Sequence, residues 1–433
     1  MKEENKGHFS ALLPLVTFVL LFIGAGLVTG DFSSMPLLVA AMIASIIALA
    51  MNRKEKLPEK VTIFTEGAGH SNIILMILIF ILAGAFAETA EGMGAVESTV
   101  NMGLTFIPEN FLLVGLFIVG CFLSISMGTS MGTVAALAPI GIGFAEQLGI
   151  PLAFVMATVM GGAMFGDNLS MISDTTIAAV RTQHTNMSDK FKTNFFIVLP
   201  GAVLAAILLF IINYGNHAAG NGTYSFDFIK ILPYIAVLIA AIAGVNVLVV
   251  LTGGILLAGL IGLFDGSYTW LTMVETISQG GLSMAEISFV VLLIGGMIGI
   301  VKHNGGIQWI LYAVTNKVRT KKGAEFGIAG LVSAADIATA NNTISILITG
   351  PLAKNIADEY EIDPRKSASL LDIFASFWQG LLPYSPQILI VSALAGISPL
   401  SMIPYSFYTI AIGVCGIVSI LVGFPRFKKT QRN

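Results

Sequence analysis

The residues best suited to bind an ion or a polar solute lie in the segment 166–176, which reads GDNLSMISDTT. Two aspartates, Asp167 and Asp174, directly follow an apolar run at 151–165. Acidic side chains at membrane depth are costly and commonly serve transport. In a helix Asp167, Ser170 and Asp174 would share one face, whereas in an unwound chain the two carboxylates would flank a cation. We expect both aspartates to couple ion movement; the alternative is that the helix ends at the cytoplasmic interface and leaves Asp174 solvated.

Two further polar segments, 126–133 and 336–343, interrupt apolar runs with hydroxyl, amide and acidic side chains. Backbone at membrane depth must be buried in protein or line a wet cavity, so we expect two hairpin tips, each followed by a half-helix. The ends of half-helices attract carboxylates or cations, and side-chain oxygens add cation ligands. The alternative is that small residues here serve close helix packing. The candidate ligands, for Na+ at the hairpin tips, are Thr129, Ser130, Thr133, Asp167, Asp336, Asn341, Asn342 and Thr343.

A fourth polar segment, 378–387, contains Trp378 and two prolines, Pro383 and Pro386, which interrupt a helix. Its amide and aromatic side chains could shape a pocket for a small molecule, or its aromatic rings could anchor a helix end at the membrane interface. Together with the first segment, it supplies the candidate solute-binding residues. These are Asn168, Ser170, Ser173, Asp174, Thr175, Gln379, Tyr384 and Ser385.

The composition places the elements that carry these residues in a membrane. Of 433 residues, 55% are hydrophobic and only 11% are charged, with a net charge of −3. This excludes an ordinary soluble enzyme and a nucleic-acid-binding protein. The pattern predicts an all-α polytopic membrane protein with about 10–12 transmembrane helices. The sequence has no nucleotide-binding loop, zinc-ligand spacing or nucleophile motif, so we expect no enzyme and no cofactor, only Na+ or H+ as coupling ions.

The distribution of Lys and Arg predicts the orientation. Four positive charges lie in each of 52–60, 317–322 and 425–433, and three more lie in 181–192, whereas 215–225 has none. Because positive charges mark cytoplasmic loops, we place both termini in the cytoplasm.

Pairs of segments are loosely alike and have opposite predicted directions. For example, 126–141 corresponds to 334–351, and 164–176 corresponds to 380–391. Such pairing is typical of inverted-topology repeats, whose halves meet near the membrane midplane. The predicted organisation is N-terminal scaffold helices at 1–72, a first inverted repeat at 73–214 with a hairpin and broken helix at 126–176, connecting scaffold helices at 215–286, and a second inverted repeat at 287–433 with a hairpin tip at 336–343 and a broken helix at 378–387.

The motif GDNLSMISDTT resembles that of the NhaC-type Na+/H+ antiporter family, within the ion-transporter superfamily. The family's usual proline is replaced by Met171, and the continuation IAAVRTQ is similar to the YuiF-like branch, whose members are described as amino-acid, often histidine, transporters. The resemblance implies an elevator-like carrier with a dimerising scaffold, two re-entrant hairpins and two broken helices. The matching positions are Gly166, Asp167, Ser170, Ser173, Asp174, Thr175 and Thr176.

The sequence therefore predicts an ion-coupled secondary active transporter of the bacterial inner membrane. It would use Na+ or H+ to move a small carboxylate-bearing solute, such as the amino acid histidine, by alternating access. The alternative is a dedicated Na+/H+ antiporter without an organic substrate. Two polar tips together with Trp378, Gln379 and Tyr384 favour the solute, because one small cation needs fewer polar groups. The expected partners are the solute, the lipid bilayer and a second copy of the chain.

Overall fold

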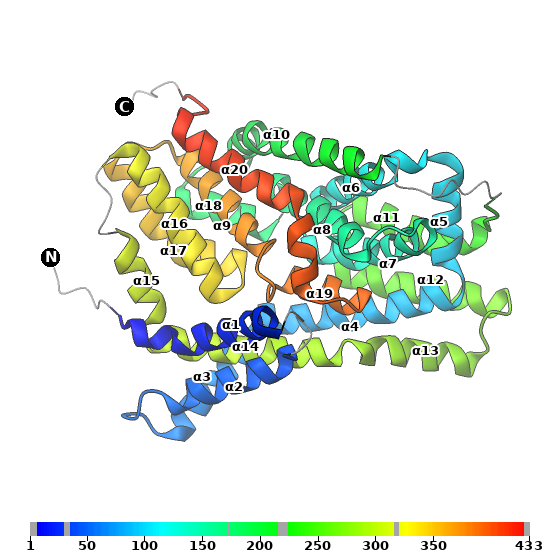
Figure 1. The fold of residues 1–433 in the computed structure, drawn as a ribbon, viewed down its shortest axis with the longest axis horizontal. Helices are drawn as coiled ribbons and strands as arrows, with labels where there is room; N and C mark the ends of the chain where they lie inside the picture. Colours follow the sequence, from blue (N-terminus) through cyan, green and yellow to red (C-terminus); the bar gives the residue numbers. More distant parts are fainter. Residues whose placement is uncertain (1–6, 30–34, 172, 215–223, 316–319, 428–433) are drawn as a thin grey trace.

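The computed structural model describes residues 7–29, 35–171, 173–214, 224–315 and 320–427. Parts of the segments 215–225, 317–322 and 425–433, on which the predicted orientation rests, lie outside these ranges. The described residues form helices and no strand (Figure 1).

The helices of the first half of the chain are η1 (Phe9–Leu12), α1 (Leu13–Thr29), α2 (Leu37–Ala50), α3 (Leu57–Ala68), α4 (Ser71–Gly92), α5 (Ala95–Phe106), α6 (Glu109–Met127), α7 (Ser130–Leu148), α8 (Leu152–Leu169), α9 (Asp174–Gln183) and α10 (Met187–Asn213). Those of the second half are α11 (Phe228–Ile242), α12 (Val247–Phe264), α13 (Trp270–Ser283), α14 (Ala285–His303), α15 (Gly306–Thr315), α16 (Lys321–Thr339), α17 (Asn342–Glu359), α18 (Pro364–Gln379), α19 (Pro386–Ala395), η2 (Pro399–Tyr405) and α20 (Phe407–Val422).

The lengths of these helices fit a membrane. Among the described residues, seven stretches are long and apolar enough to span it, or eight if the bent pair α19–η2 counts as one span. Four further apolar helices are shorter, at 10–17 residues. The helix α10 exposes Phe196, Leu204, Ile207 and Ile211, as contact with lipid requires. These findings confirm the predicted all-α polytopic fold.

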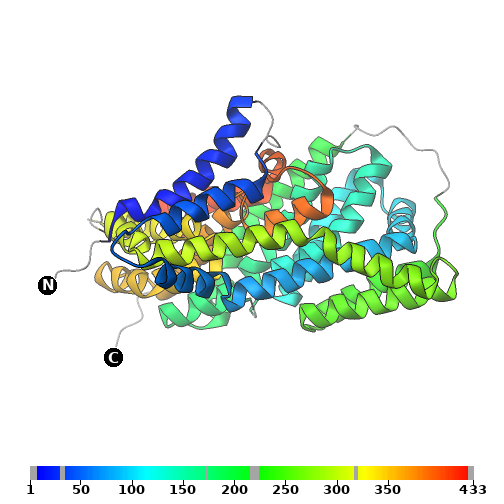
Figure 2. The ribbon, with the colours of Figure 1, turned by 90° about the horizontal axis from the view of Figure 1, so that it is seen from below.

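Two pairs of long helices run along the molecule, and each pair joins one helix from the first half of the chain to one from the second half. The helix α3 packs on α14, and α13 packs on α4 (Figure 2). Both contacts depend on glycine: a Cβ atom at Gly67 would lie 2.6 Å from the Gly295 carbonyl oxygen, and one at Gly84 would lie 2.2 Å from that of Gly280. Without side chains at these positions, the backbones approach closely enough to build one continuous layer.

Two helical hairpins, α6–α7 and α16–α17, point towards each other from opposite ends of the molecule (Figure 1). Each turns at one residue with positive φ, Gly128 (67°) or Ala340 (48°). Residues with positive φ also follow α7 (Gly149) and α17 (Glu361), and again α9 (His184) and α19 (Gly396). In each of the three pairs, the residue of the second half comes the same number of positions after its counterpart in the first half. The backbone therefore repeats its turns in register across the two halves.

Each hairpin is followed by a broken helix, α8–α9 or α18–α19. After each break a serine side chain caps the new helix: Ser173 accepts from the Thr176 amide, and Ser385 accepts from the Ile388 amide. Serine is a favoured N-cap residue because its hydroxyl satisfies an amide that the helix leaves free. The two breaks keep free helix ends inside the protein, where they can face polar groups.

The ends of the molecule differ in charge. The α2–α3 turn, the start of α16 and the end of α20 lie at one end, and the α12–α13 turn lies at the other (Figure 1). The first group carries Arg53, Lys54, Lys321 and Lys322. This arrangement places the described basic segments on one side; their cytoplasmic location stays a prediction.

Candidate functional site

Asp167 lies in the last turn of α8 and contacts the first residue of α7. Its carboxylate accepts hydrogen bonds from the Ser130 backbone amide (3.1 Å) and the Ser130 hydroxyl (2.5 Å). Only 5% of Asp167 is exposed. The N-terminus of a helix carries free amides and a positive partial charge, both of which favour a carboxylate. The first hairpin tip is thus an anion-binding end that the protein fills with its own acid.

A chain of amides connects this contact to the other hairpin. The Gln387 side-chain amide donates to the Ser130 hydroxyl oxygen (3.0 Å) and accepts from the Gln379 amide (2.7 Å). The same Gln379 nitrogen donates to the carbonyl of Ala340, the turn residue of the second hairpin (3.3 Å). Both hairpin tips and both helix breaks are therefore joined through consecutive buried hydrogen bonds.

At the second tip, the asparagines organise the turn. The Asn341 side chain accepts from the Ile344 amide and the Asn342 side chain accepts from the Thr343 amide, each at 2.9 Å. Asp336, one turn earlier, is fully buried, and neither carboxylate oxygen makes a hydrogen bond within the described structure. The Ser345 hydroxyl, in the first turn of α17, donates to the Asn342 carbonyl (2.8 Å). A buried carboxylate with so little compensation is costly and is suited to hold a proton or a cation.

The remaining candidates of the first half mainly bond the backbone. Thr133 donates to the Thr129 carbonyl (3.0 Å), and Ser170 donates to the Ile125 carbonyl (2.8 Å). Ser173 and Thr175 donate to the Asp167 carbonyl at 3.2 and 3.3 Å. The Ser170 bond holds the end of α8 against α6, and the Ser173 and Thr175 bonds tie the start of α9 to the end of α8 beside Asp167.

One buried cluster behind this break was not predicted. The Lys190 ammonium on α10 donates to the Asp372 carboxylate (2.8 Å), the Asn168 carbonyl (2.9 Å) and the Thr176 hydroxyl (2.6 Å). Asn194 donates to the first two of these oxygens. The sequence gives little indication of this cluster. Charge bias assigns Lys190 to a cytoplasmic segment, and its partner Asp372 lies far away in the chain.

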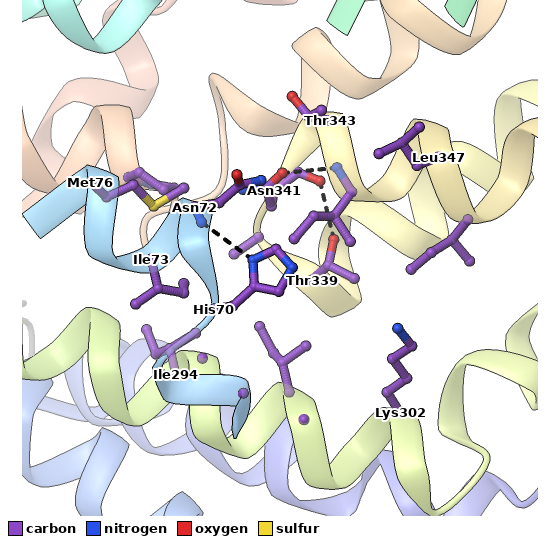
Figure 3. Close-up of a pocket in the computed structure, with 18 of the residues that line it drawn as sticks. His70, Asn72, Ile73, Met76, Ile294, Lys302, Thr339, Asn341, Thr343 and Leu347 are labelled. Carbon is purple, nitrogen blue, oxygen red and sulfur yellow. Dashed lines mark hydrogen bonds between the residues drawn. The ribbon is translucent and has the colours of Figure 1, made fainter. Parts of the chain in front are cut away.

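A cavity of about 750 Å³ lies between the long layer and the second hairpin. Its walls come from α3, α4 and α14 on one side and from α9, α17 and α19 on the other (Figure 3). Four predicted site residues line it: Asp174, Asn341, Thr343 and Tyr384. The predicted residues that do not are Thr129, Ser130, Thr133, Asp167, Asn168, Ser170, Ser173, Thr175, Asp336, Asn342, Gln379 and Ser385.

The cavity carries charges of both signs on mostly apolar walls. Asp174 is exposed at the first turn of α9, and Arg181 lies two turns further on. Lys302 extends from the end of α14 into the space in front of α17, and Glu66 lies on α3 (Figure 3). Neither Arg181 nor Lys302 is among the site residues predicted from the sequence, because the packing that turns them towards one space is not a local pattern. A few charged groups on apolar walls are the usual makeup of a small-molecule site.

Comparison with known proteins identifies the fold's family. The Na+/H+ antiporter family matches residues 9–214 and 223–424. The chain belongs to the Na+/H+ antiporter family. This family member is 25% identical to the Na+/H+ antiporter NhaC of Bacillus subtilis, over 90% of this chain and 92% of that one. The resemblance to NhaC-type antiporters is confirmed.

Other relatives of this family member are named for organic substrates. It is 24% identical to the malate-2H+/Na+-lactate antiporter of Bacillus subtilis, over 84% of each chain. It is 22% identical to the arginine/ornithine antiporter ArcD of Halobacterium salinarum, over all of this chain and 94% of that one. A solved structure, the YdaH transporter of Alcanivorax borkumensis, matches with a TM-score of 0.43 and 15% identity, over 96% of this chain and 99% of that one.

Membership of this family settles the class of protein. The chain is a multi-span membrane transport protein, not an enzyme, and its family uses coupling ions instead of a cofactor.

Proposed function

We propose that this family member couples the movement of Na+ or H+ to that of a small carboxylate-bearing solute, with an amino acid such as histidine as the first candidate. The observation that carries this proposal is the cavity beside the second hairpin tip. At about 750 Å³ it falls within the range of small-molecule pockets, roughly 300–1,000 Å³, and far exceeds the needs of one cation.

The charges in the cavity suit an amino acid. Arg181 and Lys302 provide cations for a carboxylate, and Arg181 can bind it through two parallel hydrogen bonds. Asp174 provides an anion for an α-ammonium group. Malate, lactate, arginine and ornithine, which the relatives' names mention, all carry a carboxylate. The proposal therefore assigns the carboxylate to the basic side of the cavity and leaves the remainder of the solute against the apolar walls.

Ion coupling is assigned to Asp167. Its carboxylate is buried, and its only described side-chain partner is Ser130, whose hydroxyl oxygen is also a potential cation ligand. A carboxylate in this environment can be neutralised by a proton or by Na+, but not by both at once. The hydrogen-bonded chain through Gln387 and Gln379 then connects the ion position with the tip that borders the cavity.

The experiment is uptake by the purified protein in liposomes. Radiolabelled amino acids, starting with histidine, and then hydroxy acids and dicarboxylates are supplied with a Na+ gradient or, separately, a proton gradient. Accumulation of one solute that depends on either gradient is expected, and the effective gradient identifies the coupling ion. Absence of uptake for all three solute classes would overturn the proposal.

A dedicated Na+/H+ antiporter is the second candidate, favoured by the direct contact between Asp167 and the first hairpin tip, which needs no organic ligand. In that case an internal pH dye would report Na+-dependent proton movement, whereas no solute would accumulate.

A further inference from the structure

The oxygen atoms around the Lys190 ammonium are of the kinds that bind a cation, although here a lysine side chain occupies the position. The three hydrogens of the ammonium have three oxygen partners: a backbone carbonyl at the end of α8, a hydroxyl in the first turn of α9 and a carboxylate on α18. Lys190 and Asp372 are both fully buried. The ammonium is therefore out of reach of bulk solvent at this position.

These three oxygens are the kinds that Na+ also takes. The Asn168 carbonyl lies at the C-terminal end of a half-helix, where the helix dipole is negative. Hard monovalent and divalent cations prefer carbonyl, hydroxyl and carboxylate oxygens. Three further buried oxygens of these residues have no hydrogen-bond donor within the described structure: the second carboxylate oxygen of Asp372 and the side-chain carbonyls of Asn168 and Asn194. Three oxygens thus bind the ammonium directly, and the same residues and Asn194 carry further buried oxygens without a donor.

Packing alone gives little reason for a charged pair here. Apolar residues of similar volume are often as stable as a buried ion pair, or more stable, because both charges lose their hydration. The pair instead links α10 to α18 and to both sides of the α8–α9 break. Asp336, another buried carboxylate of the second half, has no lysine partner among the described residues.

We propose that the Lys190 ammonium is a tethered cation that occupies a latent monovalent-cation site at the α8–α9 break. The site is formed by Asp372, Thr176 and the Asn168 carbonyl. Lys190 holds the break closed without consuming a transported ion. Removing the ammonium exposes a site that takes Na+ from solution.

Thermal unfolding of purified variants tests this directly, because it needs no transport. Lys190→Ala is compared with the wild type in equal concentrations of NaCl and choline chloride. A ligand that binds only the folded state stabilises it by mass action, so the variant should gain several degrees in NaCl beyond any gain of the wild type. The extra gain should disappear in Lys190→Ala/Asp372→Asn, which lacks the carboxylate.

A second variant keeps the test decisive if Lys190→Ala does not fold in either salt. Lys190→Met retains most of the side-chain volume and removes only the ammonium, so it should show the same added response to Na+. An unchanged difference between NaCl and choline chloride in every folded Lys190 variant would overturn the proposal. So would an equal gain in the double variant, since the response would then come from another site. If the wild type takes up no solute at all, the proposed function fails, but the effect of Na+ on the unfolding of the Lys190 variants still tests the cation site.

Discussion

Asp167 and Gln379 occupy equivalent positions in the two halves of the molecule, and each contacts the hairpin tip of its own half. Both lie the same distance along the chain after the left-handed residue of their hairpin, Gly128 or Ala340. Asp167 accepts from Ser130, whereas Gln379 donates to the Ala340 carbonyl. The two halves thus share a geometry but carry different chemistry: one position holds an acid and the other a neutral amide.

This asymmetry predicts that Asp167→Asn abolishes ion coupling. The amide keeps the shape of the carboxylate but cannot exchange a proton for Na+. Na+-dependent proton movement should therefore fall to the level of protein-free liposomes. An internal pH dye in liposomes measures it. The matched control is Glu146→Gln, at an exposed acid on α7. Full activity of Asp167→Asn would remove this residue from the coupling mechanism.

Gln387 should affect the affinity for Na+ without being essential for transport. Its amide donates to the Ser130 hydroxyl oxygen, which itself contacts Asp167. Gln387→Ala removes one hydrogen bond of about 0.5–1.5 kcal/mol, so the KM for Na+ should rise roughly two- to tenfold. Because the ion ligands remain, the maximal rate should change less. Initial rates over a series of Na+ concentrations separate the two effects; an unchanged KM would mean that the chain of amides is structural only.

The cationic side of the cavity predicts the effect of Arg181. Arg181→Gln removes the group proposed to bind the solute carboxylate, so the KM for solute should rise by about tenfold or more. Lys192→Gln, at an exposed basic residue on α10, removes the same charge away from the cavity and serves as the control. Equal KM values for both variants would place the carboxylate elsewhere.

The α4–α13 contact predicts a stability effect. A Cβ atom at Gly280 would lie 2.4 Å from the Gly84 carbonyl oxygen, so Gly280→Leu forces the helices apart. Overpacking costs about 1–3 kcal/mol, and the unfolding temperature should fall by several degrees. At Gly253 on α12 no heavy atom lies within 4 Å of an added Cβ, so Gly253→Leu should leave that temperature almost unchanged. Similar values for the two variants would contradict the close contact.

The sequence predicts those features that local patterns determine. Apolar runs predict the helices, and Gly128 and the residues around Ala340 stand where hydroxyl and amide groups interrupt them. The prolines at 383 and 386 predict the α18–α19 break, because proline cannot continue a helix. The family follows from one short motif, since it combines two acids with four hydroxyl residues.

Contacts between distant segments are not encoded in this way. Lys190 and Asp372 are paired only because α10 crosses α18, and charge bias alone assigns Lys190 to the interface. The cavity likewise needs eight helices from both halves, so Arg181 and Lys302 could not be recognised as neighbours of one space. Periodicity reports which face of a helix is apolar; it does not report which helix covers that face.

One measurement tests the central claim most directly: solute uptake and internal pH followed together in the same liposomes after a Na+ gradient is imposed. We expect the wild type to accumulate one carboxylate-bearing solute in proportion to the gradient, and Asp167→Asn to lose the response to Na+. Proton movement in response to Na+ without accumulation of any such solute would contradict the account and identify a dedicated Na+/H+ antiporter.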